Sequence, residues 1–394
     1  MTPSVTRTPA GLILDGNEVD VYTLTSPGGV AIQVMTLGGI VLSIDAPDRD
    51  GQPGEVTLGH AEPWEYLDNR AYFGALVGRY ANRIAGASFE VDGVSFRVDA
   101  NDGANHLHGG VRGLHTQVWK AEPFESGGAR GLVLSCKSPR GESGFPGELT
   151  VEVTYTLTDG GEWIVDYHAK TDRPTPVNLT QHTYFNLAGC GDVLGHRLQV
   201  AADRYLPVRP DGIPGGAPAN VGGTPFDLRS PQPLGPGLAS EHPDIRAVSG
   251  YDHSFILNAN SDTGADGPAP DAPSPEGDTE SDTPSPEVAP TARPAAHLYD
   301  PASGRTLTVL TTEPAVQVYT GNHLATIRNR SGEYYREHAG VCLETQHLPD
   351  SPNRPDFPNT ILRPGKPFSS QTVFVFGTDA DGKELGAAPD PETD

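Results

Sequence analysis

Residues 149–169, LTVEVTYTLTDGGEWIVDYHA, decide the class of the fold. In the first half, apolar and polar residues alternate, and the apolar ones are Leu149, Val151, Val153, Tyr155 and Leu157. After Asp159-Gly160-Gly161 the alternation resumes at Trp163, Val165, Tyr167 and Ala169. Strict alternation places the apolar side chains on one face of a strand, and a glycine-rich turn between two such runs is typical of a hairpin. The stretch therefore predicts an antiparallel β-hairpin with one buried face.

The same pattern extends outward along the chain. A second hairpin is predicted from Phe89 to Val98 through the turn Asp92-Gly93, and Val373–Phe376 is a late β-rich run. The neighbourhood of Pro63–Leu67 favours one helical turn, and convincing helical stretches are otherwise scarce. The chain contains 47 glycines and 38 prolines, which supply turns between short strands. We predict an all-β chain, a sandwich or a barrel.

Charge and length exclude several classes of protein. The 394 residues suffice for two or three average domains or one large all-β unit. The formal net charge is −24, which argues against nucleic acid or an anionic membrane surface as a partner. No run approaches the roughly 18 apolar residues that a transmembrane helix needs.

Cysteine use and the N-terminal sequence predict a cytoplasmic protein. The three cysteines, Cys136, Cys190 and Cys342, are far apart and form no C-x-x-C pair, so neither a disulfide framework nor a zinc site is expected. The first residues lack the apolar segment of a signal peptide. We interpret Cys342 as a small buried residue.

Two acidic segments depart from the strand pattern. Residues 258–296 are rich in Pro, Asp, Glu, Ser and Gly, and such a composition predicts a disordered insertion. We expect this insertion to interrupt a hairpin, with Asp252–Leu257 on one side and His297–Tyr299 and Arg305–Leu310 on the other. Residues 378–394 are predicted to be a mobile tail, which leaves residues 1–377 as one domain.

The segment with the strongest indication of a functional site is NLTQHTYFNLAG, residues 178–189. This segment places an imidazole, that of His182, among amides, hydroxyls and aromatic rings. Such groups can hydrogen-bond a polyhydroxylated ligand, and histidine can give or take a proton near neutral pH.

Five further segments repeat the theme, and with the first they carry a resemblance. They are GRYANRI (78–84), NHLHGG (105–110), GYDHSF (250–255), VQVYTGN (316–322) and CLETQ (342–346). In that order, the six segments resemble the aldose 1-epimerase (galactose mutarotase) family, over most of the chain from about Gly38 to Phe376. The resemblance implies a large antiparallel β-sandwich, a galactose mutarotase-like supersandwich with few short helices, and a sugar cleft on one sheet.

The implied reaction interconverts the α and β anomers of a free aldose, such as glucose or galactose, through its open-chain aldehyde. A base removes the proton of the C1 hydroxyl while an acid protonates the ring oxygen. The resemblance assigns the base to Glu344 and the acid to His182, which we expect at opposite edges of the sugar ring. No cofactor and no metal is expected.

The resemblance also implies a set of substrate-binding residues. Two nearby residues are not expected in this set. Arg79 lies four residues before Arg83 and could be confused with it. In an extended segment His106 would share a face with His108, and the two could bind a metal if a third ligand lay nearby. The implied set is Asn82, Arg83, His108, Thr183, Tyr184, Asp252 and Gln317.

Three alternatives stay open from the sequence. A hexose-6-phosphate 1-epimerase would need a further cationic anchor for the phosphate. An inverting glycosidase could use Asp252 and Glu344. A noncatalytic sugar-binding module would be expected to lack Glu344 or His182. Val318 and the pair His347-Leu348 depart from the family pattern, which leaves the preferred aldose open, and the sequence does not distinguish a monomer from a homodimer.

Overall fold

The computed structural model describes residues 2–259 and 291–381, and antiparallel strands dominate it. The predicted hairpin of residues 149–169 forms two adjacent interior strands of a nine-stranded sheet, and Tyr155 pairs with Val165 across it. In spatial order this sheet contains β11 (Lys120–Ser126), β12 (Ala129–Ser138), β13 (Leu149–Thr158), β14 (Glu162–Thr171), β28 (Phe368–Thr378), β24 (Arg305–Thr311), β23 (Arg293–Tyr299), β18 (Arg197–Val200) and β21 (Gln232–Pro233).

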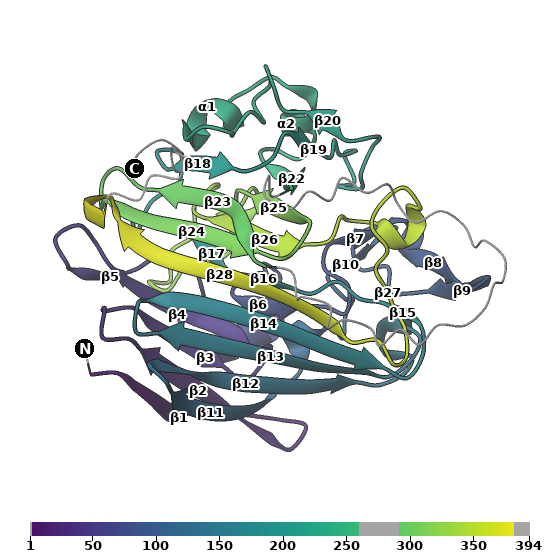
Figure 1. Cartoon of the computed structure of the whole chain (residues 1–394), viewed down its shortest axis with the longest axis horizontal. Helices are drawn as coiled ribbons and strands as arrows, with labels where there is room; N and C mark the ends of the chain where they lie inside the picture. The colour runs from purple at the N-terminus through teal and green to yellow at the C-terminus, as the bar shows by residue number, and fades with distance from the viewer. Residues whose placement is uncertain (1, 260–290, 382–394) are drawn as a thin grey trace, which may run out of the picture.

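Two further sheets lie behind the nine-stranded one in Figure 1. The six-stranded sheet contains β17 (Tyr184–Phe185), β26 (Val341–Gln346), β25 (Ala315–Tyr319), β22 (Asp252–Ile256), β19 (Arg204–Tyr205) and β20 (Ala219–Asn220). The five-stranded sheet contains β1 (Ser4–Leu14), β2 (Asn17–Thr25), β3 (Ala31–Met35), β4 (Ile40–Pro47) and β5 (Pro53–Glu55).

Smaller elements complete the described part of the chain. The two-stranded ladders are β6 (Ala75–Val77) with β16 (Thr180–His182), β7 (Arg83–Ile84) with β10 (His106–Leu107), β8 (Ser88–Val91) with β9 (Val94–Arg97), and β15 (Thr175–Pro176) with β27 (Ile361–Leu362). The helices are short: α1 (Leu234–Leu238), α2 (Pro243–Ala247), and the 3₁₀ turns η1 (Pro63–Asp68), η2 (Ala85–Ala87), η3 (Leu114–Thr116), η4 (Glu142–Gly144), η5 (Leu324–Thr326), η6 (Ser351–Asn353) and η7 (Asp379–Asp381). No described helix is long and apolar enough to span a bilayer.

One hydrophobic core joins the three sheets and decides which side chains face away from it. Leu134 and Val153 of the nine-stranded sheet, Val34 of the five-stranded sheet, and Val316 and Leu343 of the six-stranded sheet belong to the same buried cluster. Because side chains alternate along a strand, the intervening residues of β25 and β26 must point to the opposite face of the six-stranded sheet. That face carries the candidate site. The all-β sandwich with few short helices is therefore confirmed.

The predicted boundaries of the two acidic segments differ from the structure at their ends. Strand β23 begins at Arg293, and Ala295 and Ala296 are buried, so the last residues of the predicted insertion belong to the core. Composition averaged over the segment hid these two small apolar residues. Residues 260–290 lie outside the described part of the chain.

The hairpin expected on either side of this insertion is wrong. Strand β22 pairs with β19 and β25 in the six-stranded sheet, whereas β23 pairs with β18 and β24 in the nine-stranded sheet. The alternation of both strands is real, but alternation does not say which strand is the partner.

The C-terminal segment also begins later than predicted. Thr378 ends β28, and the Asp379 carboxylate accepts a hydrogen bond of 2.8 Å from Arg49. The strand therefore holds the first residues of the predicted tail, of which residues 382–394 lie outside the described part of the chain.

Candidate active site

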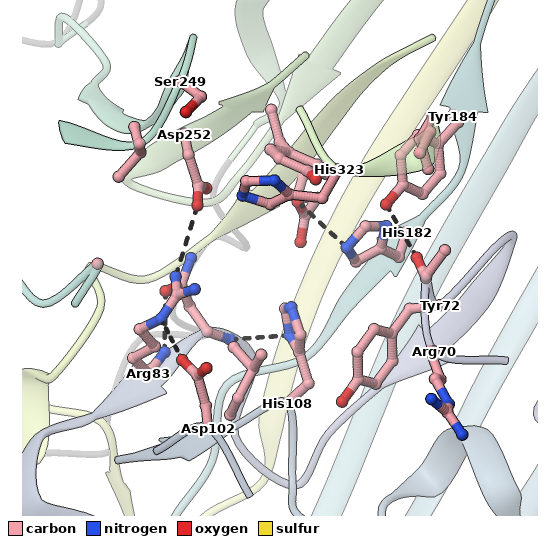
Figure 2. A pocket seen from close by; sticks show the side chains of 18 of the residues that line it. Arg70, Tyr72, Arg83, Asp102, His108, His182, Tyr184, Ser249, Asp252 and His323 are labelled. Carbon is pink, nitrogen blue, oxygen red and sulfur yellow. Dashed lines mark hydrogen bonds and ion pairs between the residues drawn. The ribbon is translucent and has the colours of Figure 1, made fainter. Parts of the chain in front are cut away.

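A cleft of about 580 Å³ opens on the face of the six-stranded sheet that points away from the core. The cleft brings together seven of the nine predicted site residues: Asn82, Arg83, His108, His182, Tyr184, Asp252 and Glu344. They come from segments that are far apart in the sequence, and the turn around residue 72 and the loops near residues 211, 249 and 323 complete the walls (Figure 2).

Glu344 reaches the cleft because its neighbours in β26 face the core. Leu343 is a core residue, so the next side chain along the strand points outward. The Glu344 carboxyl group is 2% exposed, and its Oε2 has no hydrogen-bond partner among the described residues. Burial, and then the nearby charge of Asp252, raise the pKa of this carboxyl group well above its ordinary value. A buried carboxylate without a partner is costly unless a ligand supplies one.

His182, at the end of β16, lies beside Glu344 in the cleft. Its Nε2 lies 3.7 Å from Glu344 Oε1, and its Nδ1 lies 3.6 Å from the Cys342 sulfur. Burial lowers the pKa of the imidazole to about 4. The same desolvation therefore makes the Glu344 carboxylate a stronger base and the His182 imidazolium a stronger acid.

This proximity corrects the expectation that the two groups lie at opposite edges of a sugar ring. A gap of 3.7 Å between Nε2 and Oε1 is too narrow for a ring to lie between them. In an aldopyranose the C1 hydroxyl and the ring oxygen are both bonded to C1. A neighbouring acid and base can therefore reach both oxygens from the same side.

His108 presents a hydrogen-bond donor to the cleft. Its Nδ1 accepts the backbone N–H of Asn82 at 3.1 Å, so in the neutral ring the proton is on Nε2. Burial, and then the neighbouring His182, lower the pKa of His108 well below its ordinary value, which favours the neutral form.

His106 does not share a face with His108. Residue 108 has a left-handed backbone with φ +51°, which ends the extended alternation assumed for residues 105–108. The His106 ring is instead fully buried, with its Nδ1 2.8 Å from the carbonyl of Asp99. The pair therefore cannot bind a metal together.

His108, His182 and Glu344 form another arrangement that has the composition of a metal site. One potential ligand atom from each lies within 4.8 Å of the others. A metal on His108 Nε2 would require that atom to be unprotonated, and Nδ1 would then have to be protonated opposite the N–H of Asn82. The backbone therefore favours hydrogen-bond donation by His108 over metal ligation.

Arg83 and Asp252 form the opposite wall of the cleft. Arg83 Nε binds the Asp102 carboxylate at 2.7 Å, and Nη1 lies 3.6 Å from Asp252. Burial opposes the charge of Arg83, but the two carboxylates outweigh it and raise the pKa of the guanidinium. The Asn82 side chain accepts the backbone N–H of Arg83 at 2.8 Å and so holds the segment at the cleft.

Two predicted substrate-binding residues do not line the cleft. Gln317 lies behind Asp252 and donates to its Oδ1 at 2.7 Å. Thr183 lies between β16 and β17 and does not line the cleft, and its hydroxyl donates to Gln181 Oε1 at 2.5 Å. Gln317 thus orients a cleft residue, whereas Thr183 is held beneath the cleft floor.

Other lining residues were not predicted from the sequence. Asp102, Ser249 and His323 contribute polar groups, and Tyr72 contributes an aromatic wall (Figure 2). Tyr319 also lines the cleft. Tyr319 lies within a quoted motif, two residues after Gln317, so alternation could have placed the two on the same face. The other four lie outside the motifs or in turns, where period-2 patterns carry no information.

The departures from the family pattern lie away from the cleft. Val318 belongs to the core, and His347 Nδ1 lies 2.6 Å from the buried carboxylate of Glu313. Leu348 packs in a separate apolar cluster. None of the three lines the cleft, so direct contact by these residues does not set the preferred aldose.

Comparison with known proteins agrees with the fold and the cleft. A family model described as aldose 1-epimerase matches residues 20–375. Galactose mutarotase of Rattus norvegicus is 42% identical over 377 residues, which cover 95% of this chain and 98% of the relative. Aldose 1-epimerase of Escherichia coli (strain K12) is 37% identical over 94% of this chain and 98% of the relative.

A solved structure extends the agreement to the backbone. Galactose 1-epimerase from Lactobacillus acidophilus NCFM superposes with a TM-score of 0.79 at 27% identity, covering 96% of this chain and 99% of the other. The matches in sequence and in structure span nearly the whole length of both partners. The chain belongs to the aldose 1-epimerase family.

Proposed function

We propose that this protein interconverts the α and β anomers of free aldoses, with Glu344 as the base and His182 as the acid. Family membership at about 40% identity over almost the full chain supports the isomerase activity that the sequence predicts. One observation supports the two roles. The buried Glu344 carboxylate has one oxygen, Oε2, without a hydrogen-bond partner among the described residues, and its other oxygen, Oε1, lies 3.7 Å from His182 Nε2.

In this mechanism Glu344 takes the proton of the C1 hydroxyl while His182 protonates the ring oxygen. The bond between C1 and the ring oxygen then breaks and leaves the open-chain aldehyde. After rotation about C1–C2, the hydroxyl group formed from the former ring oxygen attacks the other face of the aldehyde. Glu344 returns its proton to the aldehyde oxygen, His182 recovers its own, and the other anomer is formed. Each positioned acid or base contributes roughly 10²–10⁴-fold to the rate.

Sugar hydroxyls remote from C1 would be bound by the other cleft residues. His108 Nε2–H and Arg83 donate, and Asp252, oriented by Gln317, accepts. Tyr184 donates its hydroxyl to the carbonyl of Ala71 at 2.9 Å, so we assign its contribution to the apolar ring face. Thr183 takes no part in the proposed binding set.

The charges of the cleft argue against a phosphorylated sugar. Arg83 is already flanked by Asp102 and Asp252, and Arg70, at the rim, is paired with Asp68 and strongly exposed. Free aldoses are therefore the favoured substrates over hexose 6-phosphates.

The other two alternatives are also less well supported. Asp252 is bound by Gln317 and faces Arg83, which suits a hydrogen-bond acceptor more than the general base of an inverting glycosidase. A binding-only module would have no reason to keep an unpartnered buried carboxylate beside an imidazole.

Polarimetry tests the proposal directly. Freshly dissolved α-D-glucose and α-D-galactose are followed at low buffer concentration, with and without the protein. We expect a faster approach to an unchanged final rotation, and the ratio of the two rates reports the preferred aldose. An unaccelerated approach with both sugars would contradict the activity, and a changed final rotation would indicate different chemistry.

Asp252 gives a prediction for pH dependence. Its charge raises the pKa of Glu344, and Glu344 must be deprotonated to act as a base. Asp252→Asn should therefore lower the pKa of Glu344 and move the limb of the kcat/KM–pH profile that reports this pKa to lower pH. KM should rise, because one carboxylate oxygen that accepts a sugar hydroxyl is replaced by an NH2 donor.

Asp102→Asn is the matched control, because it also removes a cleft carboxylate next to Arg83 but one that does not contribute to the shifted pKa of Glu344. In this variant the limb that reports Glu344 should stay near its wild-type position. An equal displacement in both variants would mean that the limb does not report Glu344.

We further propose a cytoplasmic enzyme that works without a cofactor or metal. The three cysteines are free of disulfides, which suits a reducing compartment. The proton transfers need only the side chains already in the cleft.

A further inference from the structure

A tyrosine with an unusual backbone conformation lies against the histidines of the cleft. The Tyr72 ring is stacked on His182 with a centroid distance of 5.8 Å and an interplanar angle of 24°. It also contacts His108 and His115, each at a centroid distance of 4.7 Å. One ring therefore contacts three imidazoles, and none of the residues assigned to the reaction above fills this place.

We propose that Tyr72 is a positioning residue of the reaction, which holds the rings of His182 and His108 in place and shields them from water. This inference rests on the proposed function. Figure 2 shows His182 between Tyr72 and Tyr184, and the Tyr184 ring lies 5.1 Å from the imidazole at an interplanar angle of 31°. Aromatic rings on both sides restrict rotation of the imidazole and replace water that would otherwise solvate it.

The turn that carries Tyr72 is built to hold it there. Tyr72 has φ +56°, a left-handed conformation that is unfavourable for a bulky side chain. The buried Asn69 holds the turn: its side chain accepts the N–H of Phe73 at 2.9 Å and donates to the Phe73 carbonyl at 3.1 Å, and its carbonyl accepts the N–H of Tyr72. Strained backbone that the surroundings hold in place is common at functional sites.

The same turn is tied to the strand that follows His182. The Tyr184 hydroxyl donates to the carbonyl of Ala71. The two aromatic walls of His182 are therefore linked through one hydrogen bond. The contacts of Tyr72 with the three histidines are made by its ring and not by its hydroxyl.

Several titratable groups face His182, and they must be considered before a pH effect is assigned to Tyr72. They are Glu344 and Cys342 from β26, Tyr319 from β25, Tyr184 from β17, and His108 and His115 from the neighbouring turns. Burial is the largest cause of the lowered pKa of both His182 and His108. Removal of the Tyr72 ring changes this burial without changing any of the charges.

Tyr72→Gly and Tyr72→Phe separate the possible roles. Glycine removes the ring and accepts the left-handed backbone, so this variant should fold. Phenylalanine keeps the ring and loses only the hydroxyl. We expect Tyr72→Gly to lower kcat by about 10²-fold, the size of effect that misplacement of a reacting group produces, and Tyr72→Phe to restore most of it.

The second measurement is an NMR titration of the His182 ring, assigned with His182→Gln, which needs no activity. The pKa of His182 should rise from about 4 toward its ordinary value in Tyr72→Gly and stay low in Tyr72→Phe. Wild-type kcat and an unmoved His182 titration in Tyr72→Gly would overturn the proposal, as would an effect on KM alone. If instead the wild-type protein fails to accelerate mutarotation while the titration shifts as expected, the proposed function fails and the role of Tyr72 in holding His182 stands.

Discussion

Glu344→Gln is expected to lower kcat by about 10²–10⁴-fold, because glutamine cannot accept the proton of the C1 hydroxyl. The two side chains have nearly the same shape, and Oε2 of Glu344 has no hydrogen-bond partner to lose among residues 2–259 and 291–381. Sugar binding should therefore remain measurable, for example by titration calorimetry with galactose. Polarimetry at saturating sugar measures kcat, and a rate close to that of the wild type would sink the assignment of the base.

The same substitution should make the protein more stable at neutral pH. Burial raises the pKa of Glu344 in the folded state above its ordinary value of 4.5, so folding is penalised once the carboxyl group of the unfolded chain has ionised. The gain in the free energy of unfolding should be absent below pH 4.5 and should grow as the pH rises toward the pKa of the folded state. Urea denaturation at several pH values measures it.

Glu313→Gln is the matched control for the effects of a buried carboxyl group. Glu313 is also 2% exposed, but it is paired with His347 at 2.6 Å and lies outside the cleft. Its replacement should reduce stability and leave kcat near the wild-type value. The two variants therefore change activity and stability in opposite ways, and a parallel response would show that burial rather than chemistry explains both.

Much of the fold is predictable because its dominant signal is local. The alternation in residues 149–169 and the Asp92-Gly93 turn each predict a hairpin from neighbouring residues, and both hairpins are present. The partner of β22 was not predictable in this way, because pairing of distant strands depends on the packing of whole sheets. The buried end of the predicted insertion was missed for a related reason, since two alanines do not alter an average composition.

The site residues also differ in how far their orientation could be predicted from local sequence. Glu344 and Asp252 lie on regular strands next to core residues, and their orientation follows from alternation. Thr183 lies between the short strands β16 and β17, and it does not line the cleft although its neighbours His182 and Tyr184 do, which a motif alone does not reveal. His108 and Tyr72 lie at left-handed residues, where only the folded turn decides the direction of the side chain.

Arg79 and Arg83 lie four residues apart, and we assign Arg79 a role in stability and Arg83 a role in substrate binding. Arg79 is 2% exposed and makes five hydrogen bonds. One goes to the Ser138 hydroxyl, and the others go to the carbonyls of Ser138, Pro139, Pro146 and Gly147. All of its donors are therefore used inside the protein, where they hold the end of β12 against the segment that leads into β13.

Arg79→Met should thus lower the free energy of unfolding by about 3 kcal/mol or more, because it leaves several buried carbonyls without a donor. Urea denaturation measures the loss. Once the variant is folded, its KM should remain near that of the wild type, since Arg79 does not line the cleft.

Arg83→Lys should lower kcat/KM and leave the free energy of unfolding nearly unchanged. Lysine keeps the charge between Asp102 and Asp252, so stability should change little, but it lacks the rigid fork of donors. We expect kcat/KM to fall by about 10–100-fold, the equivalent of one hydrogen bond of about 1.5–3 kcal/mol to a charged group. If Arg79→Met lost substrate affinity and Arg83→Lys lost stability, the assignment of the two arginines would be inverted. The expected outcome would separate them by burial and by hydrogen-bond partners, which a motif containing both residues cannot do.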